Sequence, residues 1–284
     1  MSIQFPSPGI KGGLQTLLAK AGIYERVKSS WMYDFYWSLF DRSILADRES
    51  EVSFYRQLLD GFRENDLVFD IGANQGYKAD IFLRLGARVV AVEPDDASQE
   101  VLRRRFLKYR LKSKKLAIVS KAISDKNSTE TMWIETPGSA KNTLSRKWAE
   151  TLEANDQRFG QRLNFGQTKE VQTISIEQLI SEFGMPFFVK IDVEGYELSV
   201  LRGMKRPVPY LSFEVNLPEF RSEGLQCIDV LGRLSPDGKF NFTADCRRGL
   251  SLPRWLSKRD FAKELESSGD ASIEVFCTSP VRYR

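Results

Sequence analysis

Acidic side chains in a chain without histidine decide which chemistry is available. The 284-residue sequence contains no histidine, which excludes Ser-His-Asp and Cys-His nucleophilic machinery and His-ligated metal sites. Acid–base steps must therefore use a carboxylate, Lys, Tyr, Cys or water. Asp192 and Glu194 follow one apolar run, Glu214 lies near the end of another, and Lys190 precedes Asp192 by two residues. Open α/β sheets build their sites just beyond the C-terminal ends of strands, so we expect these four residues to form a catalytic centre.

Each of these residues also has a purely structural interpretation. Asp192 could bond a backbone amide or a cofactor amine, Glu194 could cap the helix that follows it, and Glu214 could pair with a Lys or Arg. Lys190 is a better charge partner for Asp192 than a base. Two close carboxylates could also bind Mg²⁺, which retains waters and needs few protein ligands. We treat Mg²⁺ as an alternative and predict no metal.

The segment from Leu67 to Asp95 must position a ligand beside that centre. It begins with the apolar run Leu67–Phe69, closed by Asp70, and continues through a glycine-bearing turn from residue 71 to 76. A helical pattern follows, and the second apolar run ends on Glu93. This order of strand, glycine turn, helix, strand and acidic tip predicts the first half of a nucleotide-binding βαβ unit.

The spacing of the turn narrows the ligand class. A dinucleotide site requires Gly-x-Gly-x-x-Gly, but in Gly72-Ala73-Asn74-Gln75-Gly76 the second glycine position is Asn74. No Gly-Lys-Ser/Thr is present to make a P-loop. A ligand with an adenosine ribose and no pyrophosphate fits better, and S-adenosylmethionine is the common one. Its amino-acid end can lie against the turn, and Glu93 can accept hydrogen bonds from both ribose hydroxyls.

The remaining patterns predict an α/β fold with helices on both faces of a mostly parallel, seven-stranded sheet. Beyond the two strands above, core strands are expected at 116–119, 187–191, 210–215, 240–244 and 273–277. Shorter strands are expected at 129–134 and 171–174. Helices are expected at 96–109, 147–154, 196–201 and 228–234, and between Ser175 and Gly184, where Ser175 and Gln178 have the spacing of a capping box.

Three regions give the domain organisation that we expect. Residues 1–60 form an N-terminal helical extension, 61–284 the main domain, and the polar stretch 135–170 a mobile insertion that is a candidate acceptor-binding loop. The aromatic-rich segment 31–40 is expected to pack against the main domain. A lid over the acceptor, or peripheral contact with a membrane, are its alternatives.

Composition sets limits on partners and compartment. The formal net charge of +4 gives no general argument for nucleic acid, and no apolar run approaches the ~18 residues that span a bilayer. The basic run 103–115 is expected to be a solvated helix face, with steering of an anionic acceptor as the alternative. Cys227, Cys246 and Cys277 lack metal-ligand spacing and are expected to be reduced thiols of a cytoplasmic protein.

Five sequence segments, which follow one another in the order of a known protein family, make a resemblance to that family specific. They are VFDIGANQGYKADIFLRLGA, VVAVEPD, AISDKNSTETMWI, VQTISIEQLI and FVKIDVEGYELSVLRG. Together they resemble the FkbM family of methyltransferases, which have the class I, Rossmann-like fold and use S-adenosylmethionine. The resemblance covers roughly residues 60–280, and KIDVEGYE is its most specific part.

The resemblance implies roles for individual residues. Those expected around the methionine portion are Asp70, Gly72, Asn74 and Gly76. Glu93 should bind the ribose, with Pro94 and Asp95 fixing the next turn, and Lys121, Ala122 and Ile123 should contact adenine. Near the transfer site it implies Lys190, Asp192, Glu194 and Gly195, with Asp192 also touching the cofactor.

We therefore expect an S-adenosylmethionine-dependent O-methyltransferase. Its acceptor would be a hydroxyl-bearing sugar, glycan or secondary metabolite, and no nucleic-acid partner is expected. The alternatives are a non-catalytic S-adenosylmethionine-binding protein and an N-methyltransferase on nucleic acid or protein. Amino-adenine enzymes of this fold carry Asn/Asp-Pro-Pro-Tyr/Phe where this chain has Asp192-Val193-Glu194-Gly195, and a nicotinamide dehydrogenase conflicts with the turn.

Overall fold

The computed structural model describes residues 42–111, 113–154, 163–269 and 272–281. The chain divides into two compact units, Met1–Asp47 and Arg48–Arg284. Helix α4 (Arg42–Leu58) crosses this division, and its residues from Arg48 onward belong to the second unit. The helices expected before residue 42, including the aromatic-rich segment 31–40, lie outside the described residues.

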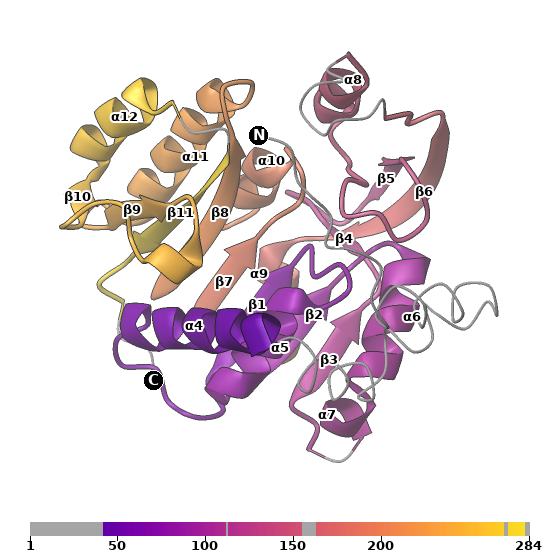
Figure 1. Ribbon diagram of the computed structural model, residues 1–284. Coiled ribbons are helices and arrows are strands. Elements are labelled where there is room, and N and C mark those ends of the chain that lie inside the picture. The colour runs from indigo at the N-terminus through magenta and orange to yellow at the C-terminus, as the bar shows by residue number, and fades with distance from the viewer. Residues whose placement is uncertain (1–41, 112, 155–162, 270–271, 282–284) are drawn as a thin grey trace. The chain divides into compact units, whose positions relative to one another are not determined.

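The second unit is built around an eight-stranded sheet in the order β10-β9-β11-β8-β7-β1-β2-β3 (Figure 1). All neighbours from β8 to β3 are parallel, whereas β11 is antiparallel to both β8 and β9. The expected α/β fold with a mostly parallel sheet is confirmed, and a two-residue edge strand adds to the seven expected. The strands are β1 (Leu67–Ile71), β2 (Arg88–Val92), β3 (Leu116–Val119), β7 (Phe188–Ile191), β8 (Tyr210–Asn216), β9 (Lys239–Thr243), β10 (Leu256–Ser257) and β11 (Ser272–Thr278).

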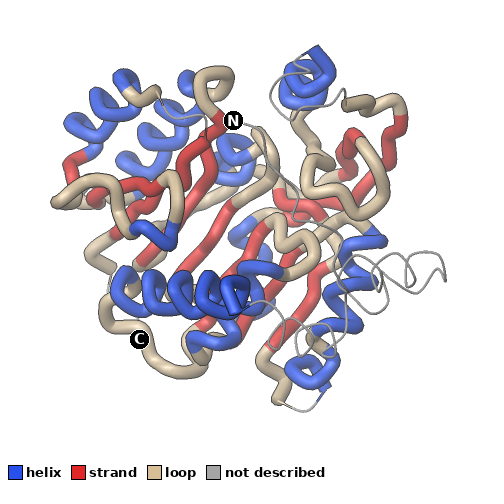
Figure 2. Tube along the Cα trace, in the orientation of Figure 1, coloured by secondary structure: helices blue, strands red, loops and turns tan. Residues whose placement is uncertain are grey.

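Helices cover both faces of this sheet (Figure 2). On one face, which we call the α4 face, the buried cluster joins β1, β7 and β11 to α4, α5 (Tyr77–Leu85) and α6 (Asp96–Arg105). On the other, the α9 face, the buried cluster includes α9 (Ile176–Phe183), α10 (Glu197–Arg202), α11 (Arg221–Leu234) and α12 (Lys258–Ser267). Burial on both faces explains why the central strands read as continuous apolar runs.

Successive side chains of a strand point to opposite faces, and this alternation places the polar residues. In β1, Val68 packs in the cluster of the α4 face, and Phe69 and Ile71 pack in that of the α9 face. Asp70 therefore points to the α4 face. Its register partner in β7 is Lys190, which points the same way. Two charged side chains thus lie side by side within an otherwise apolar sheet.

A second, three-stranded sheet has the order β4-β6-β5 and carries the polar stretch 135–170. Its strands are β4 (Ala122–Ile123), β5 (Thr129–Ile134) and β6 (Gln167–Ile174). β6 begins four residues before the expected 171. The sequence pattern does not show this start, because the side chains of residues 167–170 are exposed and form no apolar run. Helix α8 (Arg146–Ala154) contributes Trp148 and Leu152 to the core of the α9 face.

Other boundaries differ from the sequence pattern for similar reasons. The helix expected at 96–109 is two helices, α6 and α7 (Leu107–Leu111), separated at Phe106. Helix α11 starts at Arg221, seven residues earlier than expected. Its first turns are mostly polar and partly exposed, so the apolar pattern does not show them. A short 3₁₀ helix, η1 (Cys246–Arg248), follows β9. Ser175 caps α9 as expected, accepting a hydrogen bond from the Gln178 backbone.

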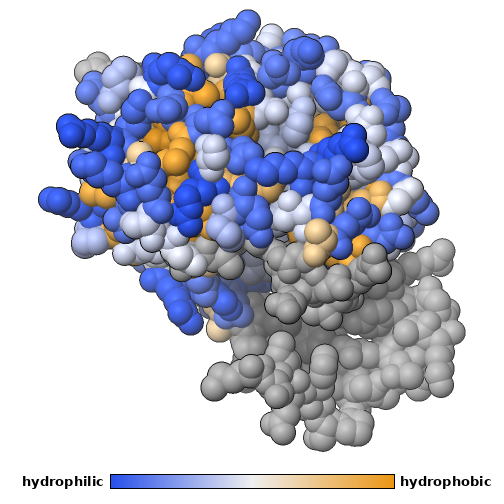
Figure 3. Space-filling model, turned by 90° about the horizontal axis from the view of Figure 1, so that it is seen from above, coloured by the Kyte–Doolittle hydropathy of each residue, from blue (hydrophilic) through white to orange (hydrophobic). Residues whose placement is uncertain are grey.

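The surface agrees with the composition. Seen from above, the described residues show mainly hydrophilic side chains, with hydrophobic ones in separate patches between them (Figure 3). Among the described helices, none is long and apolar enough to cross a membrane. Cys227, Cys246 and Cys277 are free and buried.

Candidate functional site

The glycine turn after β1 is fixed by a close approach between backbones. Gly72 has a φ of 77°, and a Cβ added there would lie 1.7 Å from the carbonyl oxygen of Asp192. Only glycine fits both this conformation and this space. The amides of Gly72 and Ala73 both donate to the carbonyl of Val92, at 3.0 and 3.1 Å. The turn therefore connects the ends of β1, β2 and β7, while Gly76, with a φ of 84°, starts α5.

Glu93, at the tip of β2, has a carboxylate held in one orientation. One oxygen accepts from the Asn74 amide at 2.7 Å, and the other from the Asp95 amide at 2.8 Å. Burial raises the pKa of Glu93 to about 7, although these two hydrogen bonds oppose the increase. Asp95 in turn caps α6 by accepting from the Ser98 amide at 2.8 Å. Each Glu93 oxygen keeps a lone pair free for a further donor.

Asp70 is fully buried, and neither of its carboxylate oxygens has a hydrogen-bond partner among the residues that the structure describes. Burial raises its pKa to about 6, against the opposing attraction of Lys190. A buried carboxylate without a donor is costly, so this position fits a site that a donor-bearing ligand or water completes.

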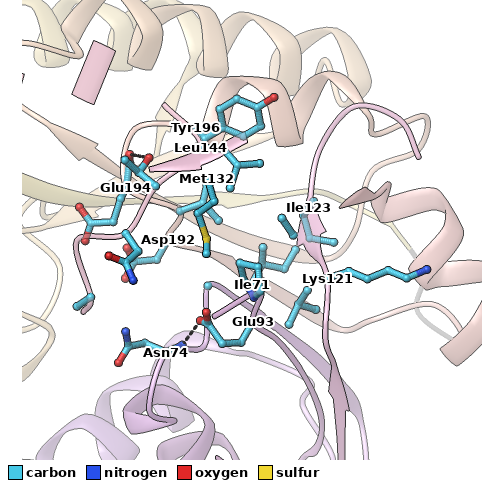
Figure 4. A pocket seen from close by; sticks show the side chains of 18 of the residues that line it. Ile71, Asn74, Glu93, Lys121, Ile123, Met132, Leu144, Asp192, Glu194 and Tyr196 are labelled. Atoms are coloured by element: carbon cyan, nitrogen blue, oxygen red, sulfur yellow. Dashed lines mark hydrogen bonds between the residues drawn. The ribbon is translucent and has the colours of Figure 1, made fainter. Parts of the chain in front are cut away.

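A pocket, which we call the first pocket, opens beside the turn (Figure 4). Glu93 and Asn74 lie at one end of the view, Lys121 and Ile123 on one side, and Asp192 and Glu194 on the other. Of the residues expected to bind a cofactor, those that line it are Gly72, Asn74, Glu93, Pro94, Lys121, Ala122, Ile123 and Asp192. Asp70, Gly76 and Asp95 are not in its wall.

Sequence reasoning missed part of this wall. The residues concerned are Met132, Ser139, Ala140, Asn142, Thr143, Leu144 and Tyr196. Asn142 donates from its side chain to Asp95 at 3.1 Å, so the start of the polar stretch 135–170 is tied to the end of β2. Ser139 to Leu144 belong to the stretch 135–170, and no local pattern showed which of its residues reach the pocket, because the pairing of Trp133 with Thr143 brings them there. Tyr196 stands in the segment KIDVEGYE, which was the available signal for it.

The loop after β7 carries an ion pair. The ammonium of Lys190 lies 2.7 Å from Asp192 Oδ2, and the Lys190 side chain is only 5% exposed. Burial would raise the pKa of Asp192, but the attraction and hydrogen bond of Lys190 outweigh it and hold the pKa below the ordinary value. Burial likewise opposes the charge of Lys190, yet Asp192 and Asp70 raise its pKa. Asp192 is therefore ionised at neutral pH.

Glu194 and Glu214 behave in the opposite way. Burial, then the charges of Glu214 and Asp192, raise the pKa of Glu194 well above its ordinary range, and the Trp148 indole donates to it at 2.9 Å. Burial, then Asp192, raise the pKa of Glu214 to about 8. Within the described part of the chain, no cation forms an ion pair with Glu214. It accepts from the Ser272 hydroxyl at 2.7 Å and from the side-chain amide of Asn216 at 3.2 Å.

The three carboxylates converge. One oxygen from each of Asp192, Glu194 and Glu214 lies within 4.8 Å of the others. Such a group could share protons, because like charges at this distance cannot all ionise easily. It could also hold a hard cation through oxygen ligands. One ionised and two mainly protonated carboxyls can accept and relay a proton from a hydroxyl.

Glu197 supports this loop and was not singled out in the sequence. Its buried carboxylate accepts from the amides of Val193 at 3.0 Å and Gly195 at 3.3 Å. Burial raises its pKa to about 7, with these hydrogen bonds opposing the increase. Glu194 does not cap α10, because its side chain turns to Trp148 and its own φ is 54°. Glu197 is the last acidic residue of the segment KIDVEGYE, and this position was the sequence signal that could have identified it.

The raised carboxyl pKa values predict how stability depends on pH. Unfolded carboxyls titrate near pH ~4, so a folded pKa of about 6 to 8 at Asp70, Glu93, Glu197 and Glu214 favours the protonated, folded form. Their contribution is present below pH ~4 and is lost as pH rises through 6 to 8. Asp192, with a lowered pKa, contributes in the opposite sense, at acid pH. The melting temperature of the cofactor-free protein should fall between pH 6 and 8.5.

Glu214→Gln should flatten that fall at its upper end, between about pH 7 and 8.5. The exposed Glu182→Gln on α9 is the control and should give a curve parallel to that of the unsubstituted protein. Thermal melts across this range make the measurement. A Glu214→Gln curve that also runs parallel would show that Glu214 does not titrate there.

Comparison with known proteins identifies the family. Residues 70–230 match the family described as the methyltransferase FkbM domain. No match was found among curated proteins. A similar solved structure is an FkbM methyltransferase from Methylobacillus flagellatus KT, with 16% identity over 80% of this chain and 47% of that chain and a TM-score of 0.48. This chain thus spans about half the length of that protein.

Two other solved structures are similar to this chain at lower identity. One is a TehB-like SAM-dependent methyltransferase from Corynebacterium glutamicum, with 8% identity, 81% and 87% of the two chains covered and a TM-score of 0.40. The other is a plantazolicin methyltransferase in complex with SAH, with 9% identity, 95% of each chain covered and a TM-score of 0.39. The family match from residue 70 to 230 covers more than half of the 284 residues. The chain therefore belongs to the FkbM family of S-adenosylmethionine-dependent methyltransferases.

Proposed function

We propose that this chain transfers a methyl group from S-adenosylmethionine to a hydroxyl group of a sugar, glycan or related metabolite. The observation that carries this proposal is the position of Asp192. It lines the first pocket, beside the glycine turn, and it also lines a second pocket together with Lys190 and Glu214. One ionised carboxylate thus faces both a site for the donor and a site for an acceptor.

The first pocket suits the donor. In this proposal Glu93 accepts the ribose hydroxyls, since two backbone amides already hold its carboxylate in place. Lys121 and Ala122 flank the adenine, and the methionine portion lies against the glycine turn. Asp70 is buried next to the turn and does not line this pocket, so it acts there only through its negative charge. When bound, S-adenosylmethionine supplies an electrophilic methyl group on a positively charged sulfur.

The loop after β7, which we call the acidic loop and which contains Asp192 and Glu194, suits a hydroxyl acceptor. A hydroxyl is a weak nucleophile until its proton departs. Asp192 Oδ accepts a hydrogen bond from that hydroxyl, and Lys190 keeps Asp192 ionised. Glu214 hydrogen-bonds to Asp192, and its pKa of about 8 lies close to working pH, where a base is most effective. Asp192 takes the proton from the hydroxyl, and the ionised form of Glu214, whose share grows as the pH rises toward 8, receives it from Asp192. Alignment of the two substrates supplies much of the rate.

The first test concerns the cofactor. Glu93→Ala should weaken S-adenosylmethionine binding about 100-fold, because two hydrogen bonds to a charged group are lost. Titration calorimetry on the full chain makes the measurement, with the exposed Glu100→Ala on α6 as a control that should bind normally. Unchanged binding by folded Glu93→Ala, or no binding by the unsubstituted protein, would contradict the proposed cofactor site.

The second test concerns the proton. Asp192→Asn should lower methyl transfer by at least about 100-fold, the usual worth of a proton acceptor. Glu214→Gln should lower it and remove the rise in rate that its ionisation near pH 8 produces. Radiolabelled S-adenosylmethionine with an extract of glycans and hydroxylated metabolites provides the assay, and the exposed Asp237→Asn is the control. Full activity in both variants would exclude these residues as the base.

A further inference from the structure

A layer of charged residues crosses the α4 face near the C-terminal ends of the strands. Five polar or charged side chains point to this face. Val68, Phe188 and Phe276, each two residues from one of them on the same strand, pack in the core of this face, and side chains two residues apart on a strand point the same way. The five are Asp70, Lys190, Ser212, Glu214 and Glu274. The register joins them in pairs: Asp70 with Lys190, Lys190 with Ser212, and Glu214 with Glu274. Buried charge of this extent is costly and calls for a function.

Lys190, Glu214 and Glu274 of this layer form one wall of the second pocket, together with Ile191, Asp192 and Ser272. The opposite wall is made by Glu51 of α4, Lys78 of α5, and the segment from Thr243 to Cys246 after β9. Among the residues that line the two pockets, Asp192 is common to both. None of the described residues of the polar stretch 135–170 lines the second pocket. The second pocket therefore meets the first at the reacting centre, from the α4 side.

The polar groups of this pocket interlock across long sequence distances. Lys78 Nζ lies 2.9 Å from Glu51 Oε2 and 3.7 Å from the sulfur of Cys246. Glu274 accepts hydrogen bonds from Ser212 at 2.7 Å, Tyr55 at 3.3 Å and Cys246 at 3.3 Å. Its partners are thus neutral hydroxyl and thiol groups. Lys78 keeps one donor, and the carboxylates keep lone pairs, for a ligand.

The balance of charge in the pocket is negative. Asp245 is paired with Arg247 at 2.9 Å, and Glu214, with a pKa of about 8, is mainly protonated at neutral pH. The remaining charged groups are the carboxylates of Glu51, Asp192 and Glu274 against the ammoniums of Lys78 and Lys190. Both cations are already engaged by carboxylates, Lys78 by Glu51 and Lys190 by Asp192.

We propose that the second pocket is the acceptor site and that it selects polyhydroxylated acceptors that are uncharged or carry an amine, while it excludes anionic ones. This inference rests on the proposed methyl transfer and specifies its substrate class. Hydroxyls both donate and accept, which matches walls that offer carboxylate oxygens and a lysine donor. A carboxylate or phosphate in the same place would lie against unneutralised negative charge with no free cation from the pocket's own lysines.

The proposal assigns separate tasks to two residues. Lys78 is a specificity residue that donates to an acceptor oxygen, and α4 holds it through Glu51. Glu274 supplies the charge that rejects anions. The described residues of the basic run 103–115 lie on α6, α7 and the approach to β3, and none of them lines this pocket. They therefore do not place a cation in the pocket for an anion to bind.

Three matched methyl glycosides test the selection: methyl α-D-glucoside, its 2-amino-2-deoxy analogue, and methyl α-D-glucuronide, which differs by a carboxylate. Binding is measured by saturation-transfer difference NMR at millimolar glycoside and neutral pH. The full chain is used with enough S-adenosylhomocysteine to occupy its cofactor site. The glucoside and the amino glycoside should bind, and the glucuronide should not. Lys78→Met should weaken glucoside binding at least about tenfold, and Glu274→Gln should admit the glucuronide. Lys108→Met on the exposed α7 is the matched control.

Each outcome decides the proposal. Glucuronide binding equal to that of the glucoside, no binding by any of the three, or Lys78→Met and Glu274→Gln variants that bind like the unsubstituted chain would overturn it. Calorimetry with S-adenosylhomocysteine on the same samples shows that each variant is folded and tests the cofactor separately. Glycoside binding without S-adenosylhomocysteine binding would contradict the proposed methyl transfer, whereas S-adenosylhomocysteine binding without glycoside binding would overturn the acceptor site alone.

Discussion

The close approach of Gly72 to the backbone of Asp192 is the constraint on which the site depends. A Cβ at residue 72 would lie 1.7 Å from the Asp192 carbonyl oxygen, so the turn after β1 and the loop after β7 can meet only if one side chain is absent. That contact brings Glu93, through the shared hydrogen bonds to Val92, close to the acidic loop. In our proposal the groups that bind the donor and the groups that take the proton are thus held by one backbone contact.

The partners of the buried acids then determine which of them are charged. At the C-terminal ends of the parallel strands lie Asp192, whose pKa is lowered, and Glu194 and Glu214, whose pKa values are raised. The difference arises because Lys190 is bonded to Asp192, whereas Glu194 and Glu214 have neutral donors. A single buried lysine therefore divides three close carboxylates into one base form and two acid forms. Separation of pKa values by environment is how proteins obtain both functions from one residue type.

Much of the fold could be predicted from the sequence, because buried parallel strands are apolar runs and glycines mark their turns. The bounds of β3 and β5 agree with the expected 116–119 and 129–134, and the family resemblance is confirmed by the match over residues 70–230. Elements with polar, exposed residues were placed less well, as the starts of β6 and α11 show. Their stability comes from pairing and packing with other segments, which no local pattern records.

The site could be predicted only where its residues follow a strand. Asp70, Glu93 and Asp192 end apolar runs, so their position in an edge cluster followed from the topology of an open sheet. Glu51, Lys78, Cys246 and Glu274 could not be found in this way. The hydrogen bonds that join them connect residues 27 to 168 positions apart. Trp148 likewise reaches Glu194 from a helix in a stretch that reads as a polar loop.

The most direct measurement of the central claim is a crystal structure of the full chain with S-adenosylhomocysteine. The account predicts that its ribose hydroxyls lie within hydrogen-bond distance of Glu93, that its adenine lies beside Lys121 and Ala122, and that its sulfur faces Asp192 at the junction of the two pockets. Density for the ligand elsewhere, or a sulfur directed away from Asp192 and the second pocket, would contradict it.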